Sequence, residues 1–109
     1  MRDEWELTTM TKVEVVVNGE DAQAVETLFR ESGATGFTAI SNVSGLGHGG
    51  YHQGRLAFND RNALALLMVV LPEVAVGELL AGLRALFGSR PGVLMVSDVG
   101  VSRPDYFAP

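Results

Sequence analysis

Residues 62–71, NALALLMVVL, decide which folds this chain can adopt. Almost every position is apolar, so the stretch predicts a strand with apolar side chains on both of its faces. One face would hold Leu64, Leu66, Met68 and Val70. The other face would hold Ala65, Leu67, Val69 and Leu71. Both faces of this strand must therefore be covered.

Downstream of this strand the pattern predicts a helix and a final strand. Pro72 and Glu73 mark the helix start, and apolar residues recur at helical spacing until Gly88. That apolar stripe consists of Val76, Leu79, Leu80, Leu83, Leu86 and Phe87. A short turn over residues 89–92 then leads into a strand over residues 93–101.

Upstream, the β-branched residues 12–17 predict a strand. A helix over residues 22–32 follows the acidic pair at 20–21, a favoured position at a helix start. Gly33 stands where a left-handed C-terminal cap is expected, and residues 35–43 form the next predicted strand. The order β-α-β-β-α-β predicts an α+β, ferredoxin-like sandwich: a four-stranded antiparallel sheet with two helices on one face.

The second face of such a sheet carries no helix, yet the strand over residues 62–71 is apolar on that side too. An exposed apolar face of this kind usually marks an interface. We therefore expect a homo-oligomer whose sheets pack around a common axis. The alternative is a monomer that hides this face beneath its own tails.

Composition limits the other possibilities. The 109 residues suit one domain, which we place at 11–103, between an N-terminal extension (1–10) and a C-terminal tail (104–109). The net charge of −5, with only eight scattered Lys and Arg residues, argues against nucleic-acid binding. No apolar run approaches the roughly 20 residues that cross a bilayer, and the polar N-terminus does not resemble a signal peptide. We expect a cytoplasmic protein without membrane insertion.

Residues 44–54 contain five glycines, which argue against a helix or a regular strand. The loop is expected to continue to about residue 62, and loops of this length are usually functional or disordered. Glycine lets backbone N–H groups approach a phosphate or another oxyanion. A disordered hairpin tip is the alternative interpretation.

The chain resembles a known family, the PII signal-transduction superfamily. The resemblance rests on T-G-F-T at residues 35–38, G-L-G at 45–47, the long loop that follows, and V-S-D-V at 96–99. It covers residues 11–103, with the family's T-loop at 45–62. It implies a homotrimer that binds adenine nucleotides in the clefts between subunits. The T-loop would respond to the nucleotide and contact a protein target.

The resemblance also implies site residues by position. The adenine would be lined by Thr38, Met68 and Val70. The T-loop would open beside the nucleotide at Gly45, Leu46 and Gly47. The phosphates would lie near Arg90, Gly92 and Arg103. Two arginines flanking the last strand of an acidic chain also suit phosphate by their bidentate geometry, although a surface arginine is more often an ordinary solvated charge.

The chain departs from the nitrogen-regulatory members at three places. The spacing from Thr38 to Gly45 is one residue longer, the segment 88–92 (GSRPG) lacks a lysine, and His48-Gly49-Gly50 replaces R-Q-K-G. Those missing groups help hold ATP, magnesium and 2-oxoglutarate, so the resemblance favours ADP or AMP. The chain looks similar to the members linked to carboxysomes and inorganic-carbon transport, which implies a response to AMP or ADP and, as in some of those members, bicarbonate as a further ligand.

The loop also contains two candidate anion contacts for bicarbonate, His48 and Arg55. His48 and His52 could otherwise suggest a metal pair, but without further ligands nearby we interpret them as solvated loop residues. No cysteine, G-x-S-x-G or phosphate-loop lysine is present, so we expect no enzyme, no catalytic residue, no metal site and no cofactor. Two alternatives remain: a metal-binding trimer of the divalent-cation-tolerance type, and a nucleotide-independent protein-interaction module.

Overall fold

A computed structural model of the chain describes residues 5–47, 50–52 and 63–107. The strands are β1 (Thr8–Asn18), β2 (Thr38–Val43), β3 (Gly45–Gly47), β4 (Gly50–His52), β5 (Leu64–Leu71) and β6 (Gly92–Val101). The helices are α1 (Ala22–Glu31) and α2 (Val76–Phe87). Short 3-10 turns are η2 (Gly19–Asp21), η4 (Glu73–Ala75) and η5 (Pro104–Tyr106).

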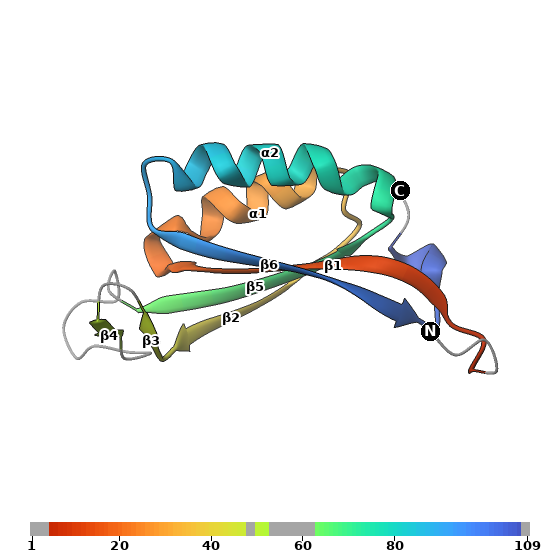
Figure 1. Cartoon of the computed structure of the whole chain (residues 1–109), viewed down its shortest axis with the longest axis horizontal. Helices are drawn as coiled ribbons and strands as arrows, with labels where there is room; N and C mark the ends of the chain where they lie inside the picture. The colour runs from red at the N-terminus through yellow and green to blue at the C-terminus, as the bar shows by residue number, and fades with distance from the viewer. Residues whose placement is uncertain (1–4, 48–49, 53–62, 108–109) are drawn as a thin grey trace.

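The main sheet has four strands in the order β2-β5-β1-β6, with neighbouring strands antiparallel. Both helices cover the same face of this sheet (Figure 1). The predicted ferredoxin-like α+β fold is therefore confirmed. No helix among the described residues is long and apolar enough to span a membrane.

The core lies between the sheet and the helices. Along β5, burial alternates at every residue, with Ala65, Leu67, Val69 and Leu71 on the buried side. β1 contributes Val13, Val15 and Val17, and the helices contribute Val25, Phe29, Leu79 and Leu83. Burial that alternates from residue to residue is expected for a strand whose sheet is covered by helices on one face.

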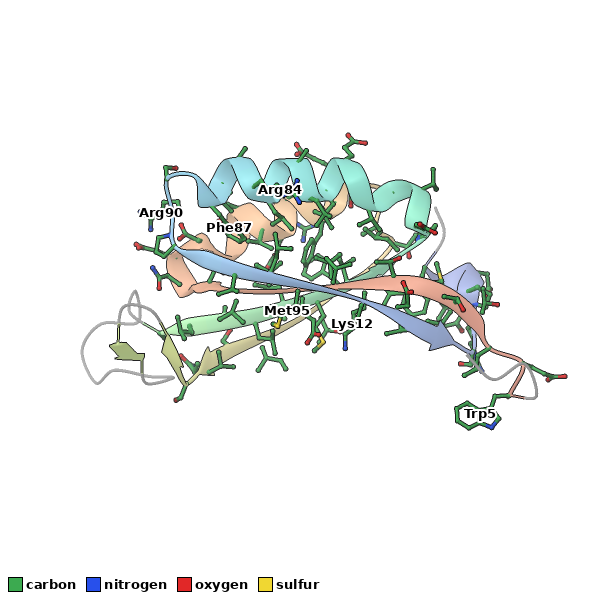
Figure 2. All side chains as sticks on the ribbon, in the orientation of Figure 1. Trp5, Lys12, Arg84, Phe87, Arg90 and Met95 are labelled. Carbon is green, nitrogen blue, oxygen red and sulfur yellow. The ribbon has the colours of Figure 1, made fainter. Side chains whose placement is uncertain are left out.

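The other face of the sheet, which we call the open face, carries apolar side chains as well, beside the Lys12–Glu14 ion pair. It carries the half-buried Leu66 and Met68 of β5 and the more exposed Ile40, Val93 and Met95. Figure 2 shows Met95 and Lys12 on the side of the sheet opposite to the helices. The described tail segments lie at the end of the sheet where β1 begins and β6 ends (Figure 1). The predicted two-sided apolar strand is confirmed, and the described tails do not run along its open face.

Several boundaries differ from the expected ones. β1 begins at Thr8 instead of residue 12, because Thr8 to Thr11 pair with the end of β6. The glycine-rich segment was expected to contain no regular strand, which was wrong, since β3 and β4 form a short antiparallel ladder from Gly45–His52 to Gly47–Gly50. Backbone hydrogen bonding needs no side chains, so glycine does not prevent it. Gly33, with φ of 91°, is the left-handed residue expected after α1.

A β-bulge interrupts β2 shortly before the T-loop. Ser41 pairs with Ala65 and Val43 pairs with Leu64, so Asn42 is one extra residue between two consecutive pairs. Asn42 has φ of 59°, a left-handed conformation that asparagine adopts more readily than most residues. The bulge accounts for the spacing of Thr38 and Gly45, which the sequence shows to be one residue longer than expected.

Candidate functional site

The residues expected around the adenine lie together near the middle of the sheet. Thr38, at the start of β2, pairs directly with Met68 of β5, and both project to the open face. Val70 lies two residues farther along the same face of β5, and pairs with Lys12. Thr38 is exposed whereas Met68 and Val70 are half-buried. The three residues form one continuous surface with a hydroxyl at its edge.

Arg103 lies at the far end of β6, in a turn closed by η5. Its Nη1 donates a hydrogen bond of 2.7 Å to the hydroxyl of Tyr106, and its guanidinium carbon is 5.3 Å from the centre of the Tyr106 ring. The Tyr106 carbonyl accepts a hydrogen bond from the Thr35 hydroxyl. The C-terminal turn is thereby joined to the segment that leads into Thr38.

The remaining described site residues gather at the opposite end of the sheet. Gly92 opens β6 and pairs with Val17, and the ladder of Gly45, Leu46 and Gly47 extends beyond the end of β2. In Figure 1 this end, with β3 and β4, lies at the left, and the blue C-terminal turn lies at the right. The structure thus separates the predicted residues into groups rather than bringing them into one pocket of one chain.

The groups of predicted site residues at the two ends of β6 lie far apart. β6 has ten residues between Arg90 and Arg103, and a rise of about 3.4 Å per residue makes the strand about 30 Å long. One nucleotide could not reach both arginines of the same chain. Residues of the two groups could serve one ligand only if neighbouring subunits supplied them.

Arg90 is held by two carboxylates at the start of α1. Its Nε lies 3.1 Å from each carboxylate oxygen of Asp21, and its Nη2 lies 2.6 Å from Oε1 of Glu20. Hydrogen bonds to Asp21, and next to Glu20, raise the pKa of Arg90 above its ordinary value. The interaction ties the α2–β6 turn to α1. Because the carboxylates already neutralise this charge, Arg90 as a phosphate contact stays a prediction.

Gly92 has a packing role that is visible without any ligand. A Cβ atom built there would lie closer than van der Waals contact to three atoms of the Phe87 ring. Phe87 itself packs against the hydrophobic core at the end of α2. A larger residue is therefore disfavoured where β6 passes beneath this ring, whether or not the backbone of Gly92 also approaches a phosphate.

Gly92→Ala is expected to destabilise the protein by about 1–3 kcal/mol, because the ring must shift to admit a methyl group. Chemical denaturation measures this change. Gly77→Ala is the matched control: a Cβ there meets nothing within 4 Å, and stability should be unchanged or higher by about 0.5–1 kcal/mol in this helix. Phe87→Leu combined with Gly92→Ala should recover part of the loss. Unaltered stability of Gly92→Ala would contradict the packing role.

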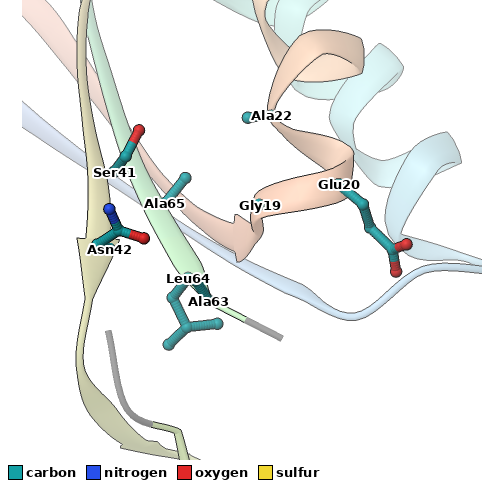
Figure 3. A pocket seen from close by; sticks show the side chains of 8 residues that line it. All are labelled: Gly19, Glu20, Ala22, Ser41, Asn42, Ala63, Leu64 and Ala65. Carbon is teal, nitrogen blue, oxygen red and sulfur yellow. The ribbon is translucent and has the colours of Figure 1, made fainter. Parts of the chain in front are cut away.

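An open hollow of about 390 Å³ lies at the same end, between the start of α1 and the end of β2. Figure 3 shows its lining: Gly19, Glu20, Ala22, Ser41, Asn42, Ala63, Leu64 and Ala65. Most of the lining residues are small or apolar, and Glu20, Ser41 and Asn42 add polar side chains. None of the predicted site residues that the structure describes lines it. It marks the place where β2 leaves the sheet and β5 enters it.

Some expected sites lie outside the described residues. These are His48 and Arg55, the candidate contacts for bicarbonate. Among the residues that the structure describes, no three His, Asp or Glu side chains gather as metal ligands would. Sequence patterns did not indicate Glu20 and Asp21 as partners of Arg90, because about 70 residues separate them. They also did not indicate Tyr106 as a partner of Arg103, nor Thr35 as the donor to the Tyr106 carbonyl.

The chain is similar to proteins of a known family. A profile described as Nitrogen regulatory protein P-II matches residues 10–106. A search of curated proteins found no significant match.

Solved structures include similar chains. One is CPII, a nitrogen regulatory PII-like protein from Thiomonas intermedia K12 bound to ADP, AMP and bicarbonate. It is 34% identical over 94% of this chain and 97% of that chain, with a TM-score of 0.88. The apo form of CPII is 30% identical over 87% and 94% of the two chains, with a TM-score of 0.69. A putative PII-like signaling protein from Thermus thermophilus shares the fold, at 19% identity, 93% and 97% coverage and a TM-score of 0.79.

Proposed function

Because the chain belongs to the P-II family of nitrogen regulatory proteins, we propose that it is a non-enzymatic, PII-like sensor of ADP or AMP. Three subunits would pack their open faces around a common axis. Each cleft between neighbours would bind one nucleotide, and the T-loop would respond by changing its contacts with a protein target. Linkage requires that the target and the nucleotide affect each other's affinity equally.

The observation that carries this proposal is the distribution of the site residues within one chain. The ends of β6 lie about 30 Å apart, yet each end carries residues that the resemblance assigns to the same nucleotide. A second subunit resolves this mismatch. The apolar open face, with Val93 and Met95 58% and 48% exposed, provides a surface through which such subunits can associate.

The choice of ligand rests on the chemistry of the chain and on CPII. The segment 88–92 has no lysine, and its arginine bonds to two carboxylates. This weakens the positive charge available to a third phosphate, and so favours ADP or AMP over ATP. CPII, which is 34% identical, was solved with ADP, AMP and bicarbonate. We extend the proposal to bicarbonate, bound with the help of His48 and Arg55, and thereby to inorganic-carbon metabolism and the carboxysome.

A thermal-shift experiment tests this function. AMP, ADP and ATP are each added to the protein with and without bicarbonate or 2-oxoglutarate. A ligand at 100 times its dissociation constant stabilises the folded state by about 2.7 kcal/mol per site. We expect ADP or AMP to raise the melting temperature by several degrees, and bicarbonate to add to that increase.

The other outcomes identify other functions. Stabilisation by ATP with 2-oxoglutarate would contradict the ligand assignment and indicate nitrogen regulation. Stabilisation by copper or zinc without any effect of nucleotide would indicate a metal-binding trimer. No response to any small molecule would leave an interaction module, and the proposed sensing function would be wrong.

A further inference from the structure

The C-terminal turn shows how Arg103 could be prepared for a ligand. Arg103 and Tyr106 are three residues apart, and η5 brings them to the same side of the turn. The turn is closed by backbone hydrogen bonds from Tyr106 N to the Arg103 carbonyl, 3.1 Å, and from Phe107 N to the Pro104 carbonyl, 3.0 Å. Pro104 at the first position restricts the backbone further.

Within this turn the guanidinium is restrained in two ways. Its Nη1 donates to the Tyr106 hydroxyl at 2.7 Å, and its carbon lies 5.3 Å from the ring centre, within the range of a cation–π contact. An exposed arginine normally loses much rotamer freedom when it binds a phosphate. A side chain that is already restrained loses less, and its affinity for the ligand rises.

The turn is also anchored at a distance. The Thr35 hydroxyl donates to the carbonyl of Tyr106, 71 residues away in sequence. Only three residues of chain, at most about 10 Å, separate Thr35 from Thr38, and Thr38 pairs with Met68 on the open face. The backbone that presents the adenine-side residues is thereby joined to the turn that presents the guanidinium.

The geometry points to Tyr106 as a positioning residue that orients Arg103 toward the phosphate of a bound adenine nucleotide, with Thr35 fixing the turn to the adenine side of the site. This inference rests on the proposed nucleotide-binding function. It adds that the base contact and this phosphate contact are supplied by one subunit as a single, internally bonded unit. Arg90, at the other end of β6, is held by the carboxylates of Asp21 and Glu20 and is not part of this bonded unit.

The experiment measures ADP and adenosine affinity by calorimetry for the wild type, Tyr106→Phe, Arg103→Met and the double variant. Tyr106→Phe keeps the ring and removes only the hydroxyl, so ADP should bind about two- to tenfold more weakly. Adenosine, which has no phosphate, should bind as it does to the wild type. In the Arg103→Met background Tyr106→Phe should have no further effect, because a positioning residue acts only through the group that it positions.

Two further variants complete the test. Thr35→Val should weaken ADP binding in the same direction as Tyr106→Phe. Arg84→Met, on the exposed face of α2 (Figure 2), removes an equal charge far from the turn and should leave ADP affinity unchanged.

The failures can be distinguished. If the wild type does not bind ADP, the proposed function is overturned, and this inference with it. If the wild type binds ADP and Tyr106→Phe binds it equally well, only the positioning role is overturned. Equal losses of ADP and adenosine affinity in Tyr106→Phe would also overturn it, because they would indicate a general structural effect.

Discussion

Met95→Glu is expected to convert the assembly into single folded chains. Met95 is 48% exposed on the open face and pairs with Glu14, so the new carboxylate would stand directly opposite an existing one. In a trimer, each subunit would place one such pair of facing carboxylates within the interface. Lys12 on the same face already pairs with Glu14, so the new carboxylate would be buried beside a like charge, and a buried charge that lacks its partner costs about 3–5 kcal/mol.

Light scattering measures the result directly. The wild type should have three times the 11.6 kDa mass of the chain, and Met95→Glu should have that mass once. Val74→Glu is the matched control, because Val74 is 93% exposed in the turn before α2, on the helix side of the molecule. It should remain a trimer. A trimeric Met95→Glu, or a monomeric wild type, would contradict the use of the open face in assembly. The monomeric variant should also lose ADP binding, because its clefts are absent.

Leu67→Ala is expected to be the most damaging single substitution for the chain itself. Leu67 is fully buried beneath the helices, in the central strand β5. Truncating such a leucine costs about 2–5 kcal/mol, a large part of the 5–15 kcal/mol that typically stabilises a domain. Its neighbour Leu66 points the other way, onto the open face, where it pairs with Val16 and Ile40.

The two leucines therefore provide a test of the two faces. In the monomeric Met95→Glu background, urea denaturation should show the full cost for Leu67→Ala and about 1 kcal/mol or less for Leu66→Ala. In the wild type, which we propose to be a trimer, Leu66→Ala should weaken association and make the melting temperature more dependent on protein concentration. Equal costs of both substitutions in the monomer would mean that each face is packed within one chain, as the monomer alternative requires.

The fold could be predicted because its signals are local and periodic. The continuous apolar run of β5 and the helical spacing in α2 each arise within a dozen residues, and α1 was predicted to within one residue of its observed end. The start of β1 could not be found in this way. Thr8 to Thr11 carry no strong alternation, and they are strand because the far end of β6 lies beside them.

The site was less accessible to sequence reasoning. The two carboxylates that hold Arg90 are 69 and 70 residues away, and only the packing of α1 against the α2–β6 turn brings them close. The resemblance identified Arg103 but gave no reason to name Tyr106. Gly92 was assigned to phosphate binding, whereas its contact with Phe87 is a separate packing constraint that no sequence pattern indicates.

The bulge at Asn42 has a consequence for how this chain tolerates changes in length. A single added residue in a regular strand would turn every later side chain to the opposite face. Here the extra residue is absorbed at one left-handed position, and Ser41 and Val43 keep consecutive partners on β5. The pairing of Thr38 with Met68 is thus insulated from the added length. During divergence, β2 of such a protein could gain or lose a residue at this position while the pairing of Thr38 with Met68 stayed in register.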